Sequence, residues 1–421
     1  MTVILGAGIT GLSVAYHLKE KNRDFIIVEK EKTPGGLCRN LDINCYTFNY
    51  TGHFLHCKTP YVRNLARKLI GDIKTIKRNS YVYLNKRIIP YPIQSNRRYL
   101  SYGSRIKTFL SYLLRNKEKP ENLEEWFVHN FGREMHNIFF LPYNEKLWKY
   151  TLKEISPDFL KSYIPKDSYV YSEKTGEYNA EFLYPEKGIG TLVSSIAKDI
   201  EISHGEVDRV EKDFIYFDGE KIEYENLIST IPLPELLKML YINGEKFGSE
   251  KVNLIWNSVL CINMGIKGKL SFGNSIKVFK KNNLDPSEFH WIYFPEKKFP
   301  FYRIGSLSNI SHSLAPENRS SIWVEVSYRE NKPDKSIVDD VIKNLEQIGL
   351  LKREAIEHIS QVDIPYAYPI YYKDCENIVQ EIRNFLKKYN ITLAGRFGDW
   401  KYSYMEESIL EGKKVALELC R

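Results

Sequence analysis

Residues 2–11 read Thr2-Val-Ile-Leu-Gly6-Ala-Gly8-Ile-Thr-Gly11, an apolar run that leads into three glycines with the spacing Gly-x-Gly-x-x-Gly. The run predicts a short buried strand, and the apolar spacing that continues to Leu18 predicts a helix. A second apolar run, Phe25–Val28, ends at Glu29. Together these segments predict a strand–helix–strand unit.

The three glycines suit a dinucleotide. Gly6 permits the tight turn, Gly8 lets a pyrophosphate approach the backbone, and Gly11 lets the helix pack on the sheet. The first turn of the helix then offers N–H groups and a partial positive charge to the phosphates. Glu29 can accept hydrogen bonds from both ribose hydroxyls and would repel a 2′-phosphate. The alternative is a glycine turn that binds nothing.

The segment Thr33-Pro-Gly35-Gly36-Leu-Cys-Arg39 follows directly. Its two glycines let the backbone pass close to a second part of a long cofactor, which favours FAD over NAD. An ordinary Pro-Gly-Gly turn is the alternative. Gly188-Ile-Gly190 is not a second fingerprint, so we expect no separate NAD(P)H domain.

Length and composition bound the class of protein. The chain has 421 residues, enough for two or three structural units, and its 43% hydrophobic and 27% charged residues exclude collagen-like and disordered classes. The net charge of +8 suits an anionic ligand, although a solvated surface accounts for most charges. Six cysteines without metal spacing predict a reduced, cytoplasmic protein. We expect no signal peptide, no membrane span and no metal site.

These patterns predict an α/β fold with a Rossmann-like FAD-binding domain, an inserted helical subdomain and an antiparallel-sheet substrate domain. The predicted ranges are 1–80, 185–240 and 385–421 for the first, 97–175 for the second, and 81–96 with 245–375 for the third. The clearest expected elements are a strand over Tyr81–Ile89 and helices over Arg105–Leu114, Leu123–Phe131, Ile337–Ile348, Ile378–Lys388 and from about Ser408.

Five further segments occur in a fixed order along the chain. They are Gly52-His53-Phe-Leu-His56, Pro90-Tyr91-Pro-Ile-Gln94-Ser-Asn96, Pro142-Tyr143-Asn144-Glu-Lys146-Leu-Trp148, Trp291-Ile-Tyr293-Phe-Pro-Glu296 with Pro300-Phe-Tyr-Arg303 and Ser308-Asn309, and Gly395-Arg396-Phe-Gly398-Asp-Trp400-Lys-Tyr402-Ser-Tyr404-Met405. With the fingerprint, they resemble UDP-galactopyranose mutases, in the FAD superfamily that includes amine oxidases, protoporphyrinogen oxidase and phytoene desaturases. The resemblance spans residues 3 to about 415.

The resemblance implies an FAD-dependent isomerase that interconverts the pyranose and furanose forms of UDP-galactose or a related nucleotide sugar. In that family an adduct forms between the sugar and N5 of reduced FAD, the reaction is redox-neutral overall, and an external electron donor keeps the flavin reduced. A role in cell-envelope glycan biosynthesis would follow. The implied cofactor residues are Gly6, Gly8, Gly11, Glu29, Gly35, Gly36, Leu37, His53, Val207, Gly395, Arg396, Gly398, Tyr402 and Met405.

A nucleotide sugar needs cations for its diphosphate, an aromatic surface for its base and hydroxyl partners for its ring. Arg303 is the candidate phosphate clamp, with a surface ion pair as the alternative. Arg303 and His53 are the candidate catalytic residues, His53 as a neutral hydrogen-bond donor and not as a general base. The substrate candidates are Tyr91, Gln94, Tyr143, Asn144, Trp148, Lys166, Trp291, Tyr293, Arg303, Tyr366, Tyr368, Tyr402 and Tyr404; core packing is the alternative for the aromatic ones.

The sequence also departs from the mutase pattern. No arginine lies between Arg133 and Arg209, where the family carries a second diphosphate arginine, so Lys161 or Lys166 would replace it without the bidentate fork. Ile310 stands where a tyrosine is expected, and Tyr404 where bacterial relatives carry an aspartate. These changes leave the sugar and the nucleotide open.

Two other functions stay open. An oxidoreductase of the amine oxidase, protoporphyrinogen oxidase or desaturase type would have an apolar tunnel in place of a cavity rich in Arg, Lys and Tyr, and a non-catalytic flavoprotein would bind FAD alone. No nucleic-acid motif accompanies the basic residues between Asn96 and Lys107, which we interpret as a solvated helix face or, alternatively, as a membrane-surface contact. The oligomeric state is open.

Overall fold

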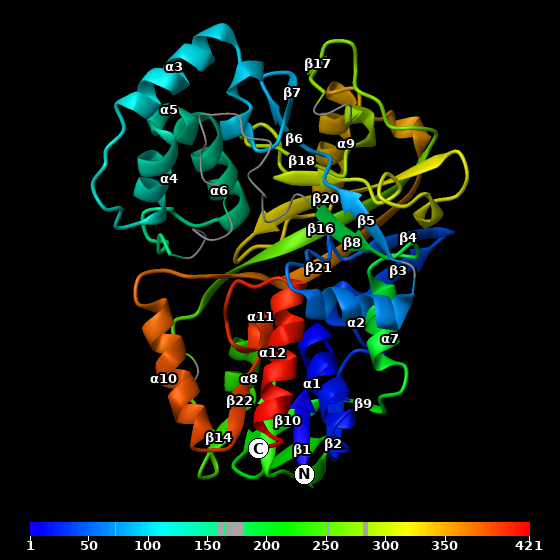
Figure 1. The fold of residues 1–421 in the computed structure, drawn as a ribbon, viewed down its shortest axis with the longest axis vertical. Helices are drawn as coiled ribbons and strands as arrows, with labels where there is room; N and C mark the ends of the chain where they lie inside the picture. The colour runs from blue at the N-terminus through cyan, green and yellow to red at the C-terminus, as the bar shows by residue number, and fades with distance from the viewer. Residues whose placement is uncertain (72, 159–163, 165–180, 249, 251, 281–284) are drawn as a thin grey trace.

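The computed structural model describes residues 1–71, 73–158, 164, 181–248, 250, 252–280 and 285–421. Two sheets organise these residues, one in the lower half of Figure 1 and one in the upper half, with a layer of helices beside the upper sheet. The mixed α/β fold class predicted from the sequence is confirmed.

The lower sheet is parallel and has the order β22 (Ile391–Leu393), β13 (Asn226–Ser229), β1 (Thr2–Leu5), β2 (Phe25–Glu29) and β9 (Ile202–His204). Val3, Ile4 and Leu5 of the central strand are buried, as a strand covered on both faces requires. Because the strands are parallel, their carboxyl ends, including the Gly6 turn and Glu29, meet at one edge.

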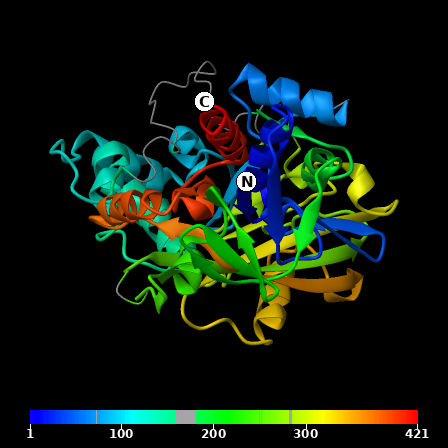
Figure 2. The same cartoon turned by 90° about the horizontal axis from the view of Figure 1, so that it is seen from below.

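Helices cover both faces of this sheet. One face carries α1 (Ile9–Lys19), α2 (Pro60–Ile70), α7 (Gly190–Ala197) and α12 (Met405–Glu418). Figure 2 shows α1 and α12 side by side near the two termini. The other face carries α8 (Leu233–Met239), α10 (Cys375–Lys387) and the small sheet β10 (Val207–Glu211), β11 (Phe214–Phe217) and β12 (Glu220–Glu223). Since α10 packs on β22, this helix lies with the lower sheet. The domain ranges predicted from the sequence end the substrate domain at residue 375 and leave residues 376–384 unassigned.

The upper sheet is mostly antiparallel. Its order is β17 (Lys277–Val278), β7 (Arg87–Pro90), β6 (Ser80–Leu84), β18 (Trp291–Tyr293), β19 (Arg303–Gly305), β20 (Arg319–Tyr328), β16 (Ile255–Lys267) and β21 (Ile356–Ile370). The strand character predicted over Tyr81–Ile89 is confirmed, but the segment forms two strands, the hairpin β6–β7. Asn85 and Lys86 both have positive φ, which closes a tight hairpin turn.

The long edge strand β21 was missed because it contains Pro365 and Pro369, which argue against a central strand. An edge strand tolerates them, since one side needs no ladder hydrogen bonds. The register between β16 and β21 shifts between Asn257 and Val259, which leaves Pro365–Ala367 as a bulge. The bulge brings residues 364–368 to the wall of the cavity described below.

The helical layer consists of α3 (Tyr102–Leu113), α4 (Leu123–Phe131), α5 (Arg133–Met135), a π-helical turn (His136–Phe140) and α6 (Leu141–Trp148). It packs against β6, β7 and the loop before β19, while α9 (Ile337–Gln347) covers the other face of the upper sheet. Within the described ranges, no helix has both the length and the apolar character needed to cross a membrane.

The remaining elements are short. They are the pairs β3 (Asn40–Ile43) with β4 (Tyr46–Asn49), β5 (Lys74–Lys77) with β8 (Glu181–Tyr184), and β14 (Tyr241–Ile242) with β15 (Glu245–Lys246), the helix α11 (Gly395–Gly398), and 3-10 turns at Gly36–Cys38, Ile93–Ser95, Arg97–Tyr99, Pro286–Glu288, His312–Leu314 and Arg353–Ala355.

Candidate functional site

A cavity of about 1120 Å³ lies between the two sheets. Its walls come from the β1–α1 turn, the end of β2, the loop at residues 50–54, α6, β18, β19, the β21 bulge and residues 396–405. Most candidates from the sequence line it: Gly6, Gly8, Glu29, Gly35, Gly36, Leu37, His53, Tyr91, Tyr143, Asn144, Trp148, Val207, Trp291, Tyr293, Arg303, Tyr366, Tyr368, Arg396, Tyr402, Tyr404 and Met405. The fold therefore gathers into one cavity residues that are spread along the whole chain.

The predicted glycines are used in different ways. A Cβ atom on Gly8 would meet nothing within 4 Å, so this residue opens a space at the start of α1. A Cβ atom on Gly11 would lie 1.9 Å from the carbonyl oxygen of Gly6, so here the helix touches the preceding turn. Gly35, with φ +116, donates its N–H to the carbonyl of Ala7 at 2.7 Å and so holds the second glycine segment beside the first.

Glu29 is fixed in place by backbone donors. Its carboxylate accepts hydrogen bonds from the N–H groups of Ala7 at 2.8 Å and Glu31 at 2.9 Å. Each carboxylate oxygen can accept more than one hydrogen bond, so both keep room for ribose hydroxyls.

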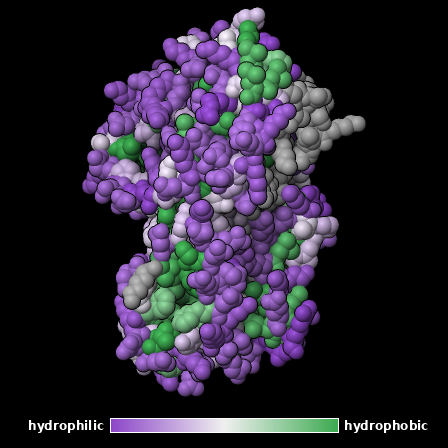
Figure 3. All heavy atoms as spheres, turned by 90° about the vertical axis from the view of Figure 1, so that its left-hand side faces the viewer, coloured by the Kyte–Doolittle hydropathy of each residue, from purple (hydrophilic) through white to green (hydrophobic). Residues whose placement is uncertain are grey.

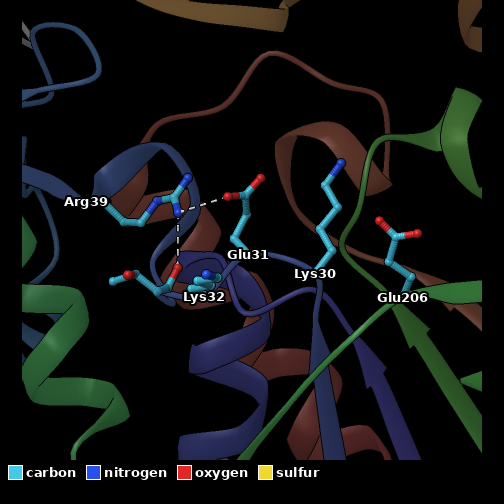
Figure 4. A pocket seen from close by; sticks show the side chains of 6 residues that line it. Lys30, Glu31, Lys32, Arg39 and Glu206 are labelled. Atoms are coloured by element: carbon cyan, nitrogen blue, oxygen red, sulfur yellow. Dashed lines mark hydrogen bonds and ion pairs between the residues drawn. The ribbon is translucent and has the colours of Figure 1, made fainter. Parts of the chain in front are cut away.

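A smaller hollow of about 470 Å³ adjoins the cavity at the end where Glu29 lies. Figure 4 shows its lining: Lys30, Glu31, Lys32, Thr33, Arg39 and Glu206. Arg39, to which the sequence gave no role, donates to the carbonyl of Thr33 at 3.2 Å and pairs with Glu31 at 3.5 Å.

Gly11, Gly395 and Gly398 do not line the cavity. A Cβ atom on Gly395 would lie 2.4 Å from Oγ1 of Thr10, and one on Gly398 would lie 2.5 Å from the carbonyl oxygen of Ser229. These glycines therefore pack the last loop against α1 and β13. In this structure Gly395 and Gly398 contact protein, and their packing fixes the position of Arg396, which lies between them in the sequence.

Arg396 lies among the aromatic residues of the cavity wall. Its guanidinium carbon is 4.7 Å from the ring centre of Tyr368 and 4.8 Å from that of Tyr402. Its terminal nitrogens donate to the carbonyls of Ser403 at 3.1 Å and Ala367 at 3.2 Å. The buried Nε atom has no hydrogen-bond partner among the described residues, which leaves one donor for a bound group.

His53 is held as a neutral ring. Burial, and then the guanidinium of Arg396, lower its pKa from 6.5 to about 4. Its Nδ1 atom is 3.2 Å from the hydroxyl of Thr51. A neutral histidine in this position agrees with the expected hydrogen-bonding role and not with a base poised near neutral pH.

We expect the substitution His53→Gln to make folding less sensitive to acid. Between pH 6.5 and 4 the unfolded chain binds a proton at this position and the folded chain does not, so stability falls as the pH falls. Lowering the pH from 7 to 5 should cost about 2 kcal/mol through His53 alone. Urea unfolding at both pH values measures the loss, which should be smaller in His53→Gln and unchanged in His312→Gln, an exposed control. An equal loss in both variants would contradict the neutral assignment.

Arg303 forms a buried ion pair. Its Nε and Nη2 atoms donate to the two oxygens of Glu325, each at 2.8 Å, and Nε1 of Trp323 donates to the same carboxylate at 3.1 Å. Burial is the largest single influence on the pKa of Arg303 and lowers it, but Glu325, Tyr368 and Tyr302 together raise it more, so the pKa lies above its ordinary value. One edge of the guanidinium is thus fixed, and the opposite edge, with Nη1 and one Nη2 hydrogen, is left for a ligand. Sequence reasoning missed Glu325.

Helix α6 is joined to the strands of the upper sheet by Lys146. Its ammonium group donates to the carbonyls of Phe294 at 2.8 Å, Glu296 at 2.6 Å and Phe301 at 3.1 Å. These residues form the β18–β19 connection, so Lys146 fixes the segment that precedes Arg303. Asn144 and Trp148 form the predicted i, i+4 patch, with a hydrogen bond of 2.9 Å from the indole Nε1 to the amide oxygen.

Tyrosines form much of the opposite wall. Tyr293 lies 4.9 Å from Tyr91 and 5.3 Å from Tyr143 between ring centres. Tyr302, which sequence reasoning missed, has a buried hydroxyl without a partner among the described residues. The hydroxyl of Tyr366 donates to Glu235, so this tyrosine is already engaged.

Two substrate candidates are not placed in the cavity. Gln94 is 1% exposed and lies outside the lining, so the structure does not bring it together with the other candidates. Lys166, like its alternative Lys161, lies outside the described residues.

Comparison with known proteins places this geometry in a family. The family model described as flavin containing amine oxidoreductase matches residues 9–420. A crystal structure of reduced UDP-galactopyranose mutase superposes with a TM-score of 0.90 at 26% identity, covering 100% of this chain and 93% of the other. A putative protoporphyrinogen oxidase from Exiguobacterium gives 0.72 at 14% identity, covering 99% and 98%, and a putrescine oxidase variant gives 0.70 at 12% identity, covering 100% and 98%. The last two show the fold alone.

The residues present fit FAD, the flavin cofactor that the family implies. The open space at Gly8 suits a pyrophosphate, the fixed carboxylate of Glu29 suits a ribose, and the unpaired Nε of Arg396 offers a donor farther along the cavity. The match over nearly the whole chain settles the family: this protein belongs to the flavin containing amine oxidoreductases.

Proposed function

We propose that this protein is a flavin-dependent mutase that interconverts the pyranose and furanose forms of a nucleotide sugar, UDP-galactose or a close relative. The observation that carries the proposal is the superposition on reduced UDP-galactopyranose mutase across the entire chain. The other named neighbours cover the chain equally well but with lower TM-scores and lower identity.

The chemistry of the cavity supports a polar, anionic substrate. Arg303 and Arg396 both line it, together with Tyr91, Tyr143, Tyr293, Tyr302, Tyr368 and Tyr402. Buried polar atoms of Tyr302, Arg396 and Ser403 lack partners among the described residues. Such atoms cost free energy unless a ligand satisfies them, so an apolar amine or polyene would fit this wall poorly.

We assign roles in this reaction to residues that line the cavity. Bound FAD in its reduced form would supply the electron-rich atom that reacts with the anomeric carbon. The free edge of Arg303 would bind the diphosphate, stabilise its charge when it leaves the sugar and hold it nearby for return. The tyrosines would orient the sugar ring in the cavity. Neutral His53 would donate or accept one hydrogen bond without taking part in proton transfer.

We expect activity only when the flavin is reduced. The purified protein should interconvert UDP-galactopyranose and UDP-galactofuranose after addition of dithionite, and a panel of other UDP- and dTDP-sugars would identify the preferred substrate. The air-oxidised protein is the control and should be inactive. Oxygen consumption with amines or carotenoid precursors, without any sugar interconversion, would instead identify an oxidase or desaturase.

A further inference from the structure

Helix α3 turns an apolar face outward. The exposed fractions are 77% for Tyr102, 42% for Ile106, 49% for Leu110, 55% for Leu113 and 84% for Leu114, which follows the helix. We call these five residues the α3 face. Figure 3 looks onto this side and shows hydrophobic surface at the top of the molecule, the level at which Figure 1 places α3. A surface helix of a globular protein ordinarily has the opposite orientation, with its apolar stripe on the core.

The inward side of α3 fixes this orientation. Thr108 is fully buried there, and the hydroxyl of Ser111 accepts a hydrogen bond of 2.8 Å from the backbone N–H of Glu134. A Cβ atom on Gly132 would lie 2.8 Å from the backbone of Ser111, so the helix is in close contact with the next element. Small polar residues therefore make these contacts with the next element, while the α3 face stays exposed.

Positive charge surrounds the α3 face. Arg105 and Lys107, both exposed, leave the helix on either side of the apolar stripe. Residues 97–119 hold seven Lys or Arg and a single Glu, while the whole chain has a net charge of only +8. The segment that contains the α3 face therefore carries an excess of six positive charges, seven basic residues minus one acidic residue.

We propose that α3 is a peripheral membrane anchor that lies in the plane of an anionic lipid surface. An exposed apolar stripe with basic residues on both edges can insert its side chains at the acyl boundary while the cations reach the headgroups. A helix of 12 residues is too short to cross the bilayer. A second copy is a poorer occupant, because a two-fold contact through this face would bring two strongly basic segments together.

The full chain with FAD should bind vesicles in a flotation assay. We expect binding to vesicles of about three parts phosphatidylcholine to one part phosphatidylglycerol, and at least about 10-fold weaker binding to phosphatidylcholine alone. Raising the salt from about 0.05 M to about 0.5 M should weaken the first interaction. Absence of binding to the anionic vesicles at low salt overturns the proposal.

Matched variants test whether α3 is the site. Leu110→Ser with Leu114→Ser, and separately Arg105→Gln with Lys107→Gln, should each weaken binding at least about 10-fold. The controls Val278→Ser with Ile359→Ser, each 39% exposed, and Lys212→Gln with Lys269→Gln, both exposed, should leave it unchanged. Flavin absorbance verifies that each variant is folded. Equal binding by all variants overturns the assignment, as does a dimer that the leucine substitutions dissociate while vesicles never bind.

Discussion

Replacing Arg303 should abolish nucleotide-sugar turnover while leaving the flavin in place. Arg303 is expected to act on the diphosphate, and loss of one preorganised donor to a developing charge lowers kcat by about 100- to 1000-fold. The affinity for UDP should fall in parallel, because the same guanidinium edge serves the bound substrate and the leaving group. FAD contacts are assigned to other residues, so the absorbance of the bound flavin should not change.

The buried partner of Arg303 complicates a simple alanine substitution. Glu325 is fully buried, and its carboxylate would lose two of its hydrogen bonds. An uncompensated buried charge destabilises a protein by about 3–5 kcal/mol, so Arg303→Ala is expected to fold poorly. The double variant Arg303→Met with Glu325→Gln removes both charges at nearly constant volume. We expect it to be more stable than the single variant and equally inactive.

Measurements on these variants distinguish a role of Arg303 in diphosphate binding from a purely structural role. Isothermal titration with UDP, flavin absorbance and urea unfolding should be measured on both variants and on Arg303→Lys, which keeps the charge without the fork. If the folded double variant binds UDP as tightly as the unmodified chain, Arg303 is a structural residue only. A loss of UDP binding with intact flavin supports the diphosphate role.

The sequence predicted contacts between residues that lie close together along the chain better than contacts between residues far apart in it. The unit from Thr2 to Glu29 was predicted almost residue by residue, because strand, turn and helix follow one another directly. The pairing of Arg303 with Glu325 was not, because it depends on the register between β19 and β20. The partners of Lys146 are backbone carbonyls of a distant connection, so no side-chain pattern marks them.

The sequence also could not predict which face of α3 lies inward. The spacing of apolar residues in Arg105–Leu114 predicts an amphipathic helix, and the helix exists, but periodicity cannot tell which face lies inward. In the structure the small residues Thr108 and Ser111 lie inward because Gly132 allows close approach. Similarly, Gly395 and Gly398 were recognised as necessary, yet only three-dimensional packing shows that they contact protein.

Two alanine substitutions in the fingerprint should change different properties: Gly8→Ala should weaken FAD binding, and Gly11→Ala should lower the stability of the fold. Gly8→Ala places a methyl group where the protein has open space, at a residue with φ −71° and ψ 177°, which any residue can adopt. The apoprotein should therefore be about as stable as the unmodified one. The methyl group would occupy the space that suits the pyrophosphate, and overpacking of about 1–3 kcal/mol corresponds to FAD affinity weaker by about 5- to 150-fold.

Gly11→Ala should instead damage the fold itself. Its methyl group would lie 1.9 Å from the carbonyl oxygen of Gly6, a backbone atom that cannot turn aside. Alanine is the better helix former by about 1 kcal/mol. This gain is small beside the displacement of α1 from the sheet that the contact requires, so urea unfolding of the apoprotein should show a clear net loss of stability.

The pair is informative because the chemical change is identical and only the surroundings differ. FAD titration and urea unfolding of both apoproteins give four measurements, of which we expect two to change strongly: affinity in Gly8→Ala and stability in Gly11→Ala. A Gly8→Ala protein that binds FAD normally would show that the pyrophosphate does not lie at the start of α1. Since Glu29, Gly35 and the cavity are all positioned relative to that turn, the placement of the flavin, and of any sugar beside Arg303, would then have to be revised.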